Sequence, residues 1–165
     1  MKLYKYERNK TVEYAVKWAK GRNPNYYDFE NLGGDCTNFA SQSLYAGCGV
    51  MNFSYPLGWF YSSAFNRSPS WTAVEYLQNF LLRKEISIGP VGKIDALSNL
   101  ELGDLVQIKT HGVYTHTLVI TKIENGGVEP FNYLVCAHTY DALNRRLSTY
   151  NLKDAKFIKI IGCYK

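Results

Sequence analysis

The sequence predicts an α+β fold in one domain, in which N-terminal helices pack on a C-terminal antiparallel sheet. Helical spacing of apolar residues dominates the first half of the 165-residue chain, whereas alternation with a period of two and frequent β-branched residues follow Asp104. Helices followed by strands are typical of α+β domains. The chain has no internal repeat, and its length suits a single core, so we expect one domain over 1–165.

Three helices are expected before the sheet. Helical spacing predicts the first over about 10–20, from Val12, Ala15, Val16 and Ala19. Cys36 opens the second, which stops at the glycines that flank Cys48. Pro69 and a capping-box spacing predict the third over about 70–84. The aromatic- and glycine-containing stretch 50–68 between the last two is expected to be a long structured loop.

Four strands are expected in the second half, at about 104–109, 114–123, 132–139 and 156–163. The middle two are predicted to form a hairpin that is symmetric about residue 127. That register places Ile120 opposite Leu134, Leu118 opposite Cys136 and His116 opposite His138. Directly opposed side chains have Cβ atoms about 5 Å apart, so the two imidazole rings could touch.

Cys36 and the two histidines suggest nucleophilic chemistry. Only a thiolate attacks a carbonyl carbon, and both an imidazole base and the N-terminus of a helix favour the thiolate. His116 is the candidate base, and His138 would orient its ring. Backbone N–H groups at Cys36 could hold the oxyanion, and Gly33-Gly34 would leave space for a substrate carbonyl.

Several motifs resemble one known family. The segment Gly33–Gln42, GGDCTNFASQ, is similar to the nucleophile motif of the bacterial "putative amidase domain" family, a branch of the NlpC-type and CHAP-type papain-like cysteine hydrolases. Gly103–Val106, His116 and the run Ala137–Asn144 are similar to that family too. The resemblance implies a circularly permuted papain-like fold, with Cys36 as nucleophile and His116 as general base and then acid.

The same resemblance implies a third polar residue that fixes the imidazole. His138 matches that position best, and Asp141 is the alternative. The candidate substrate contacts are Asp35, Asn38, Tyr27 and Trp59. Asp35 is also a natural N-cap for the helix that Cys36 opens. The hydroxyl of Tyr26 or Tyr27 is a further candidate donor to the oxyanion.

The resulting hypothesis is a cysteine amidohydrolase or peptidase that cleaves an amide bond in the stem peptides of peptidoglycan. Two alternatives stay open. An acyltransferase or transpeptidase would use the same Cys36–His116 dyad, and a catalytically silent cell-wall binding domain would keep the groove without turnover. The expected partner in each case is a peptide or a peptidoglycan-like polymer.

Composition excludes several classes. The net charge of +5 is spread along the chain without a dense basic run, so no nucleic-acid partner is expected. No apolar run is long enough to span a membrane, and residues 1–10 do not resemble a secretory signal. We therefore expect a monomer that is secreted or wall-associated if the domain comes from a longer protein, and cytoplasmic otherwise.

No cofactor and no metal are expected, because the four cysteines form no CxxC pair. A metal site made of Cys36, His116, Cys136 and His138 has suitable ligand types, but these ligands are dispersed along the chain. A disulfide such as Cys136–Cys163 stays open.

Overall fold

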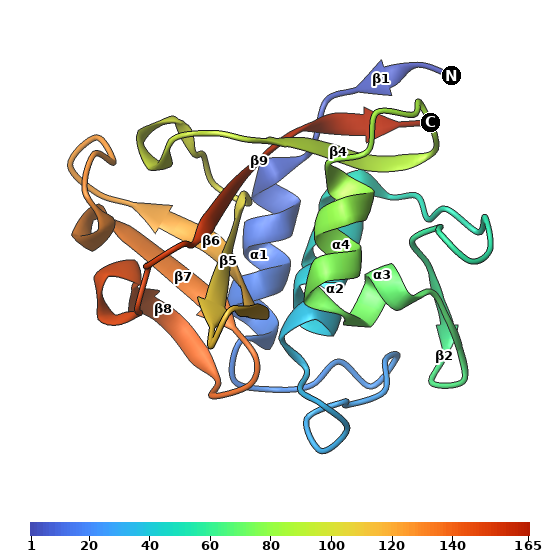
Figure 1. Ribbon diagram of the computed structural model, residues 1–165, viewed down its shortest axis with the longest axis horizontal. Coiled ribbons are helices and arrows are strands. Elements are labelled where there is room, and N and C mark those ends of the chain that lie inside the picture. The colour runs from blue at the N-terminus through green and yellow to red at the C-terminus, as the bar shows by residue number, and fades with distance from the viewer.

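One antiparallel sheet of seven strands organises the computed structural model, which describes residues 1–165 (Figure 1). The strand order is β1-β9-β5-β6-β7-β8, and β4 pairs with β9. A separate small hairpin is formed by β2 and β3. The strands are β1 Leu3–Tyr4, β2 Tyr61–Ser63, β3 Asn66–Arg67, β4 Gly89–Ile94, β5 Leu105–Thr110, β6 Val113–Ile123, β7 Tyr133–Ala137, β8 Ala142–Arg146 and β9 Lys156–Tyr164.

Four α-helices accompany the sheet. They are α1 Arg8–Trp18, α2 Cys36–Cys48, α3 Pro69–Thr72 and α4 Val74–Leu81. Helices α1, α2 and α4 all contact β6. Three short 3-10 helices, Leu97–Asn99, Pro130–Asn132 and Leu147–Thr149, belong to the connections between strands. The predicted α+β class is confirmed, with helices in the first half and most of the sheet in the second.

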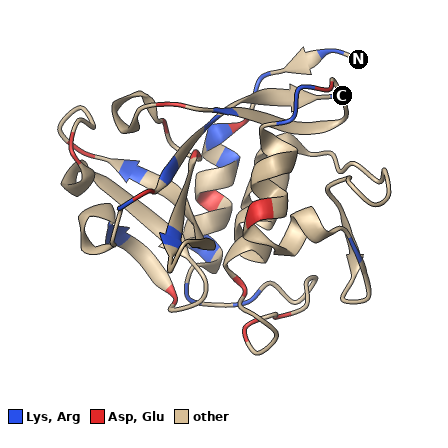
Figure 2. Cartoon of the chain, in the orientation of Figure 1, with Lys and Arg blue, Asp and Glu red and all other residues tan.

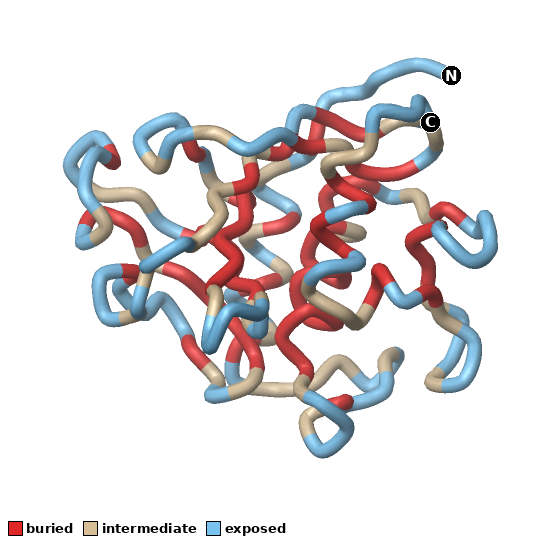
Figure 3. Tube along the Cα trace, in the orientation of Figure 1, coloured by how far each residue is buried: buried red, intermediate tan, exposed pale blue.

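The sheet separates two hydrophobic cores. The larger joins apolar residues of α1, α2 and α4 to one side of the sheet and includes Phe39, Leu44 and Val119. The smaller lies among β5, β6, β7 and the 3-10 helices and includes Ile108, Leu118 and Ile120. Figure 3 shows the buried segments concentrated in the strands and the central helices, with exposed turns around them. Because β6 contributes to both cores, the face on which each of its side chains lies decides what that side chain can meet.

Helix α2 is buried on nearly all sides, which explains its small residues. Eleven of its 13 residues are buried. A Cβ built on Gly47 would lie 2.2 Å from Thr11 Oγ1 and 2.6 Å from the ring of Tyr6, so α1 can approach α2 only over a glycine. The predicted bounds of the second helix are confirmed, and its first residue is Cys36.

The other element predictions are confirmed in part. The third helix is divided, because Ala73 is extended at φ −115° and ψ 131° and separates α3 from α4. The four predicted strands correspond to β5, β6, β7 and β9, whereas β4 and β8 were not predicted. Pro90 lies in β4, which pairs with β9 alone, and such an edge position tolerates the missing N–H of proline.

The predicted register of the β6–β7 hairpin is wrong by one residue. Cys136 lies opposite Val119 instead of Leu118, and Val135 lies opposite Ile120. The pairing then shifts between Ile120 and Lys122, so Thr121 is an extra residue in β6. A shift of one residue moves a side chain to the opposite face of a sheet, and here it separates His116 from His138.

Two links hold the ends of the chain. The backbones of Lys2 and Lys165 exchange two hydrogen bonds, of 3.0 and 3.1 Å, so both termini lie side by side at one edge of the sheet (Figure 1). A disulfide joins Cys48 at the end of α2 to Cys163 in β9. The pair Cys136–Cys163 considered from the sequence is therefore wrong, and Cys36 and Cys136 are free thiols.

Candidate active site

Cys36 is one of the residues that line a cavity of about 400 Å³. It is the first residue of α2, and its side chain is buried. The thiol Sγ lies 3.8 Å from Thr37 Oγ1 and 3.8 Å from the carbonyl oxygen of Thr115 in β6. Burial raises the pKa of this thiol, and hydrogen bonds from the backbone of Thr117 and from Thr37 partly oppose that effect. The thiol is therefore protonated at neutral pH in this conformation.

The loop before Cys36 is shaped by Gly34. A Cβ on this residue would lie 2.9 Å from Thr139 Oγ1, and its φ of +103° is accessible mainly to glycine. The close approach allows Thr139 Oγ1 to accept a hydrogen bond of 2.9 Å from the backbone N–H of Asp35. The backbone N–H of Cys36 has no acceptor in the chain, as is usual in the first turn of a helix. It is free to donate to a ligand in the cavity.

His116 lies on the face of β6 that points away from Cys36. Its neighbour Thr117 faces α2, because Thr117 Oγ1 lies 3.2 Å from Thr37 Oγ1. His116 instead pairs with Ile108 of the smaller core, and its ring centroid lies 6.1 Å from that of Tyr150. Burial, together with the nearby charge of Arg145, lowers the pKa of His116 to about 4. The structure does not bring the predicted base to the predicted nucleophile.

His138 does lie on the helix side of the sheet, where it contacts Asp35 instead of His116. Its Nδ1 is 2.5 Å from Asp35 Oδ2, and its Nε2 is 2.7 Å from the carbonyl oxygen of Trp18. The ring stacks on Phe39 with centroids 4.2 Å apart. Both polar side chains are buried, so they form an internal link between α1, β7 and the start of α2.

Asp141, the alternative orienting residue, forms a bidentate pair with Arg22, with contacts of 2.9 and 3.1 Å. Arg22 also lies within ion-pair distance of Asp28, Glu30 and Asp35. One guanidinium thus gathers four carboxylates beside the helix that carries Cys36. Asp141 has no contact with His116.

Three of the four predicted substrate contacts are buried among protein groups. Asp35 occupies the N-cap position but makes no side-chain hydrogen bond to the helix backbone; it accepts from Asn38 Nδ2 at 2.8 Å. Asn38 also accepts a hydrogen bond from Trp71 Nε1. Trp59 donates to Ser41 Oγ at 3.1 Å. Tyr27 is about half exposed, and its ring lies beside Phe29 at the cavity.

Other residues of the cavity were not predicted. Arg67, Thr72, Val74, Tyr114 and Thr115 line it with Cys36. Their signal in the sequence was weak, because they come from β3, α3, α4 and β6, which are distant along the chain from Cys36. Thr115 and Thr117 flank His116, so the Thr-His-Thr alternation shows only that the threonines and the histidine face opposite sides.

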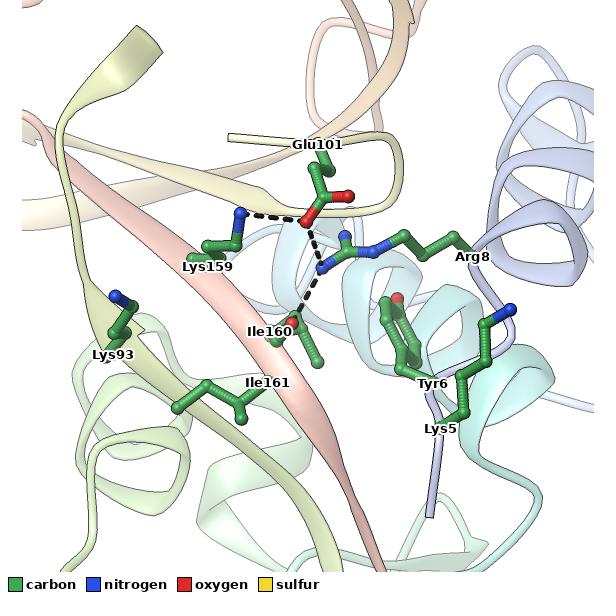
Figure 4. Close-up of a pocket in the computed structure, with 8 residues that line it drawn as sticks. All are labelled: Lys5, Tyr6, Arg8, Lys93, Glu101, Lys159, Ile160 and Ile161. Atoms are coloured by element: carbon green, nitrogen blue, oxygen red, sulfur yellow. Dashed lines mark hydrogen bonds and ion pairs between the residues drawn. The ribbon is translucent and has the colours of Figure 1, made fainter. Parts of the chain in front are cut away.

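Another cavity, of about 470 Å³, lies away from Cys36 (Figure 4). Three of its five charged residues pair with each other: Glu101 lies 3.3 Å from Arg8 and 2.8 Å from Lys159. Arg8 also contacts the fully buried Asp104 at 2.7 Å. These bonds tie α1 to β9 and to the start of β5, so this cavity has a structural explanation. Figure 2 shows the Lys and Arg residues distributed over many helices, strands and loops.

The chain was compared with known proteins. No solved structure matches it. An uncharacterised protein of Bacillus subtilis (strain 168), YhbB, is 30% identical over 149 residues. The match covers 87% of this chain but only 45% of that relative, so the chain spans about half of its length. The structure contains no group of three or more His, Cys, Asp or Glu side chains arranged to hold a metal ion, and none of its helices could cross a bilayer.

A family model described as "Putative amidase domain" matches residues 5–161, which is nearly the whole chain. The description indicates hydrolysis of amide bonds in general. The match includes the Cys36 cavity, both cores and the central strands of the sheet. The chain therefore belongs to the putative amidase domain family.

Proposed function

We propose that this protein is a cysteine amidase in which the Cys36 thiolate attacks a substrate amide. The observation that carries the proposal is the place of Cys36: it is the first residue of a buried helix, it lines a cavity, and its own backbone N–H has no acceptor. A helix N-terminus stabilises a thiolate, and the free N–H suits a developing oxyanion. Membership of an amidase family agrees with this chemistry.

His116 remains our proposed base, and a β-bulge gives it a route to Cys36. Thr115 is an extra residue in β6, because Ile108 pairs with His116 while Lys109 pairs with Tyr114. The bulge could move along β6, so that Thr117 and not Thr115 is the extra residue. The flanking pairs Lys109–Tyr114 and Val106–Leu118 would then be unchanged. His116 would then lie opposite Gln107 instead of Ile108.

Gln107 marks the helix side of the sheet, because its side chain bonds Gln78 at 2.8 Å and the Val74 carbonyl at 3.0 Å in α4. The rearranged His116 would thus enter the space beside Thr37, next to the thiol. Only residues 115–117 need to change their pairing. Leaving the small core would also end much of the desolvation that lowers the pKa of His116, so the imidazole could accept the thiol proton.

In the reaction that we propose, His116 takes the proton of Cys36, and Sγ forms a bond to the amide carbon. The C–N bond then breaks, and His116 returns the proton to the departing amine. Water adds to the thioester carbon, and breaking of the C–S bond yields the carboxylate and the free thiol. The His138–Asp35 pair holds the start of α2 in place during these steps.

The proposed substrate is the stem peptide of peptidoglycan. The Cys48–Cys163 disulfide supports this choice, because disulfides persist in oxidising compartments outside the cytoplasm, where cell-wall polymers are found. Digestion of purified sacculi should release new amino and carboxyl groups in equal amounts with the native chain and none with Cys36→Ser. Incorporation of an added amine in place of free acid would identify a transferase instead.

The thiolate is tested by the rate of iodoacetamide labelling at each free thiol against pH. We expect Cys36 to react faster than Cys136 below pH 8 and to lose this advantage in His116→Ala. Cys136 is the internal control, because it is a free and fully buried thiol in the same chain. Equal, slow labelling of both thiols in the native chain would refute the proposal.

The bulge migration is tested by oxidising the His116→Cys variant. A disulfide between Cys36 in α2 and position 116 can form only when the side chain at position 116 lies on the face of β6 that α2 covers. The matched control is Ile108→Cys, because Ile108 lies opposite His116 on the far face. Cross-linking in the first variant and not in the second supports the migration, and its absence in both would leave His116 without a route to the thiol.

A further inference from the structure

A second cavity, of about 390 Å³, lies between the segment 52–57 and helix α4. Eleven residues line it, and the surface that they present to the cavity is mainly apolar, with a smaller polar share. They are Asn52, Ser54, Pro56, Leu57, Ser70, Tyr76, Asn79, Phe80, Arg83, Glu85 and Ser87. The cavity shares no residue with the one that contains Cys36. Its chemistry is therefore independent of the nucleophile.

Arg83 gives this cavity a positive charge but no donor for an anion. Its guanidinium makes five hydrogen bonds, to Ser87 and to the carbonyl oxygens of Phe80, Ser87, Pro90 and Ile88. Arginine has five N–H groups, so all of them are used inside the protein. Glu85 lies close enough to balance the charge. A phosphate or carboxylate ligand would thus find no free pair of guanidinium N–H groups at this site.

The groups that remain available suit a neutral ligand with many hydroxyls. The side chains of Ser54, Tyr76, Asn79 and Glu85 have no hydrogen-bond partner in the chain and line the cavity. Together these side chains offer both hydrogen-bond donors and hydrogen-bond acceptors. Tyr76 is 52% exposed and Leu57 is 75% exposed, so an aromatic and an aliphatic surface stand beside these polar groups.

We propose that this cavity is a saccharide-binding site. A pyranose ring has an apolar face, which can stack on Tyr76, and equatorial hydroxyls, which can bond Asn79, Ser54 and Glu85. A concave site with an aromatic wall and a few oriented polar groups is the usual form of a small-ligand pocket. Buried Asn52 holds the loop in place, because its Nδ2 donates to the Ile88 carbonyl and its Oδ1 accepts from Ser54 N.

The site lies across α4 from the catalytic cavity. Val74 lines the Cys36 cavity, whereas Tyr76 and Asn79 line the saccharide site. Two positions along a helix correspond to a rotation of about 200°, so Val74 and Tyr76 face opposite sides of α4. The saccharide site would hold a glycan at a distance from Cys36, as an anchor and not as part of the reaction.

The experiment is a ¹H–¹⁵N chemical-shift titration of the Cys36→Ala chain with a β-1,4-linked N-acetylglucosamine tetrasaccharide. We expect saturable shifts confined to residues 52–57 and 76–87. The dissociation constant should rise at least about fivefold in Tyr76→Ala and in Asn79→Ala. Asn66→Ala is the matched control, because Asn66 is an exposed asparagine outside the cavity, and it should bind like the parent chain.

Two results would overturn the proposal: no saturable shift up to about 10 mM saccharide, or shifts that Tyr76→Ala and Asn79→Ala leave unchanged. Inorganic polyphosphate serves as the anionic probe, and a response of these residues to it alone would also contradict a saccharide site. Because the tested chain lacks the thiol, the result does not depend on the proposed amidase activity. Either proposal can fail while the other stands.

Discussion

The imidazole of His138 touches a hydrogen-bond acceptor on each side: Asp35 Oδ2 lies 2.5 Å from Nδ1, and the Trp18 carbonyl lies 2.7 Å from Nε2. A neutral imidazole has one N–H and can satisfy only one of them. The geometry is satisfied when Nε2 carries one hydrogen and a second hydrogen lies between Nδ1 and Asp35 Oδ2. The two side chains then form a buried, hydrogen-bonded link at the start of α2, next to Cys36.

The hydrogen between these two side chains predicts a clear spectroscopic signature. The ¹H spectrum should show a strongly deshielded resonance for the hydrogen between His138 Nδ1 and Asp35 Oδ2, and His138→Gln should remove it. The same variant should lower the free energy of unfolding by about 1–3 kcal/mol, because buried Asp35 Oδ2 loses its hydrogen-bond partner. A native spectrum without this resonance would contradict the proposed link.

His116 should make stability depend on pH in the opposite direction from a salt-bridged histidine. Its pKa falls from 6.5 to about 4 through burial, so the unfolded chain binds the proton more readily than the folded chain. The free energy of unfolding should therefore decrease as the pH falls from about 6.5 to 4, by up to about 3 kcal/mol. Urea unfolding at several pH values measures this slope, and His116→Leu should remove it.

The Cys48–Cys163 disulfide closes a loop with a sequence separation of 115 residues. Cross-links over loops of this length stabilise proteins by about 2–5 kcal/mol. The double variant Cys48→Ser/Cys163→Ser should lose stability in that range, with unfolding measured under non-reducing conditions. Cys136→Ser, which removes a buried but free thiol, is the control for loss of packing alone. Peptide mapping that finds four free thiols in the oxidised native protein would refute the cross-link.

Gly47 should tolerate no side chain. In Gly47→Ala the new Cβ would overlap Thr11 Oγ1 and the ring of Tyr6, so we expect a loss of about 1–3 kcal/mol and a lower melting temperature. Gly21→Ala is the matched control. Its nearest contact would be a carbon of Trp18 at 3.8 Å, an ordinary distance, so its stability should stay the same or rise slightly. Equal effects at both positions would show that the change in stability comes from backbone entropy and not from the α1–α2 contact.

The sequence was informative where periodicity is strong. The bounds of α2, the four central strands and the place of Cys36 at a helix N-terminus follow from residue spacing and end signals. The site was harder to predict, because its geometry depends on bulges. One extra residue at Thr115 and another at Thr121 change which face each side chain occupies. Alternation in the sequence does not mark where such a residue is inserted.

The burial of polar residues was the second feature that could not be predicted from the sequence. Asp35 and Asn38 are candidate substrate contacts in the sequence, but α2 is covered on nearly every side. Their polar groups bond to each other and to Trp71, His138 and Phe29. Those partners are up to 103 residues away, and no local pattern connects them.

The two termini lie side by side, which makes the fold suitable for circular permutation. Because Lys2 and Lys165 are hydrogen-bonded neighbours just beyond β1 and β9, a few glycine and serine residues could connect them without crossing the molecule. New ends opened at the exposed turn around Gly126 would leave every strand pair intact. Such a circular permutant should fold to the same structure. For the same reason, the unit could sit between two segments of a longer polypeptide, with both connections leaving from a single edge.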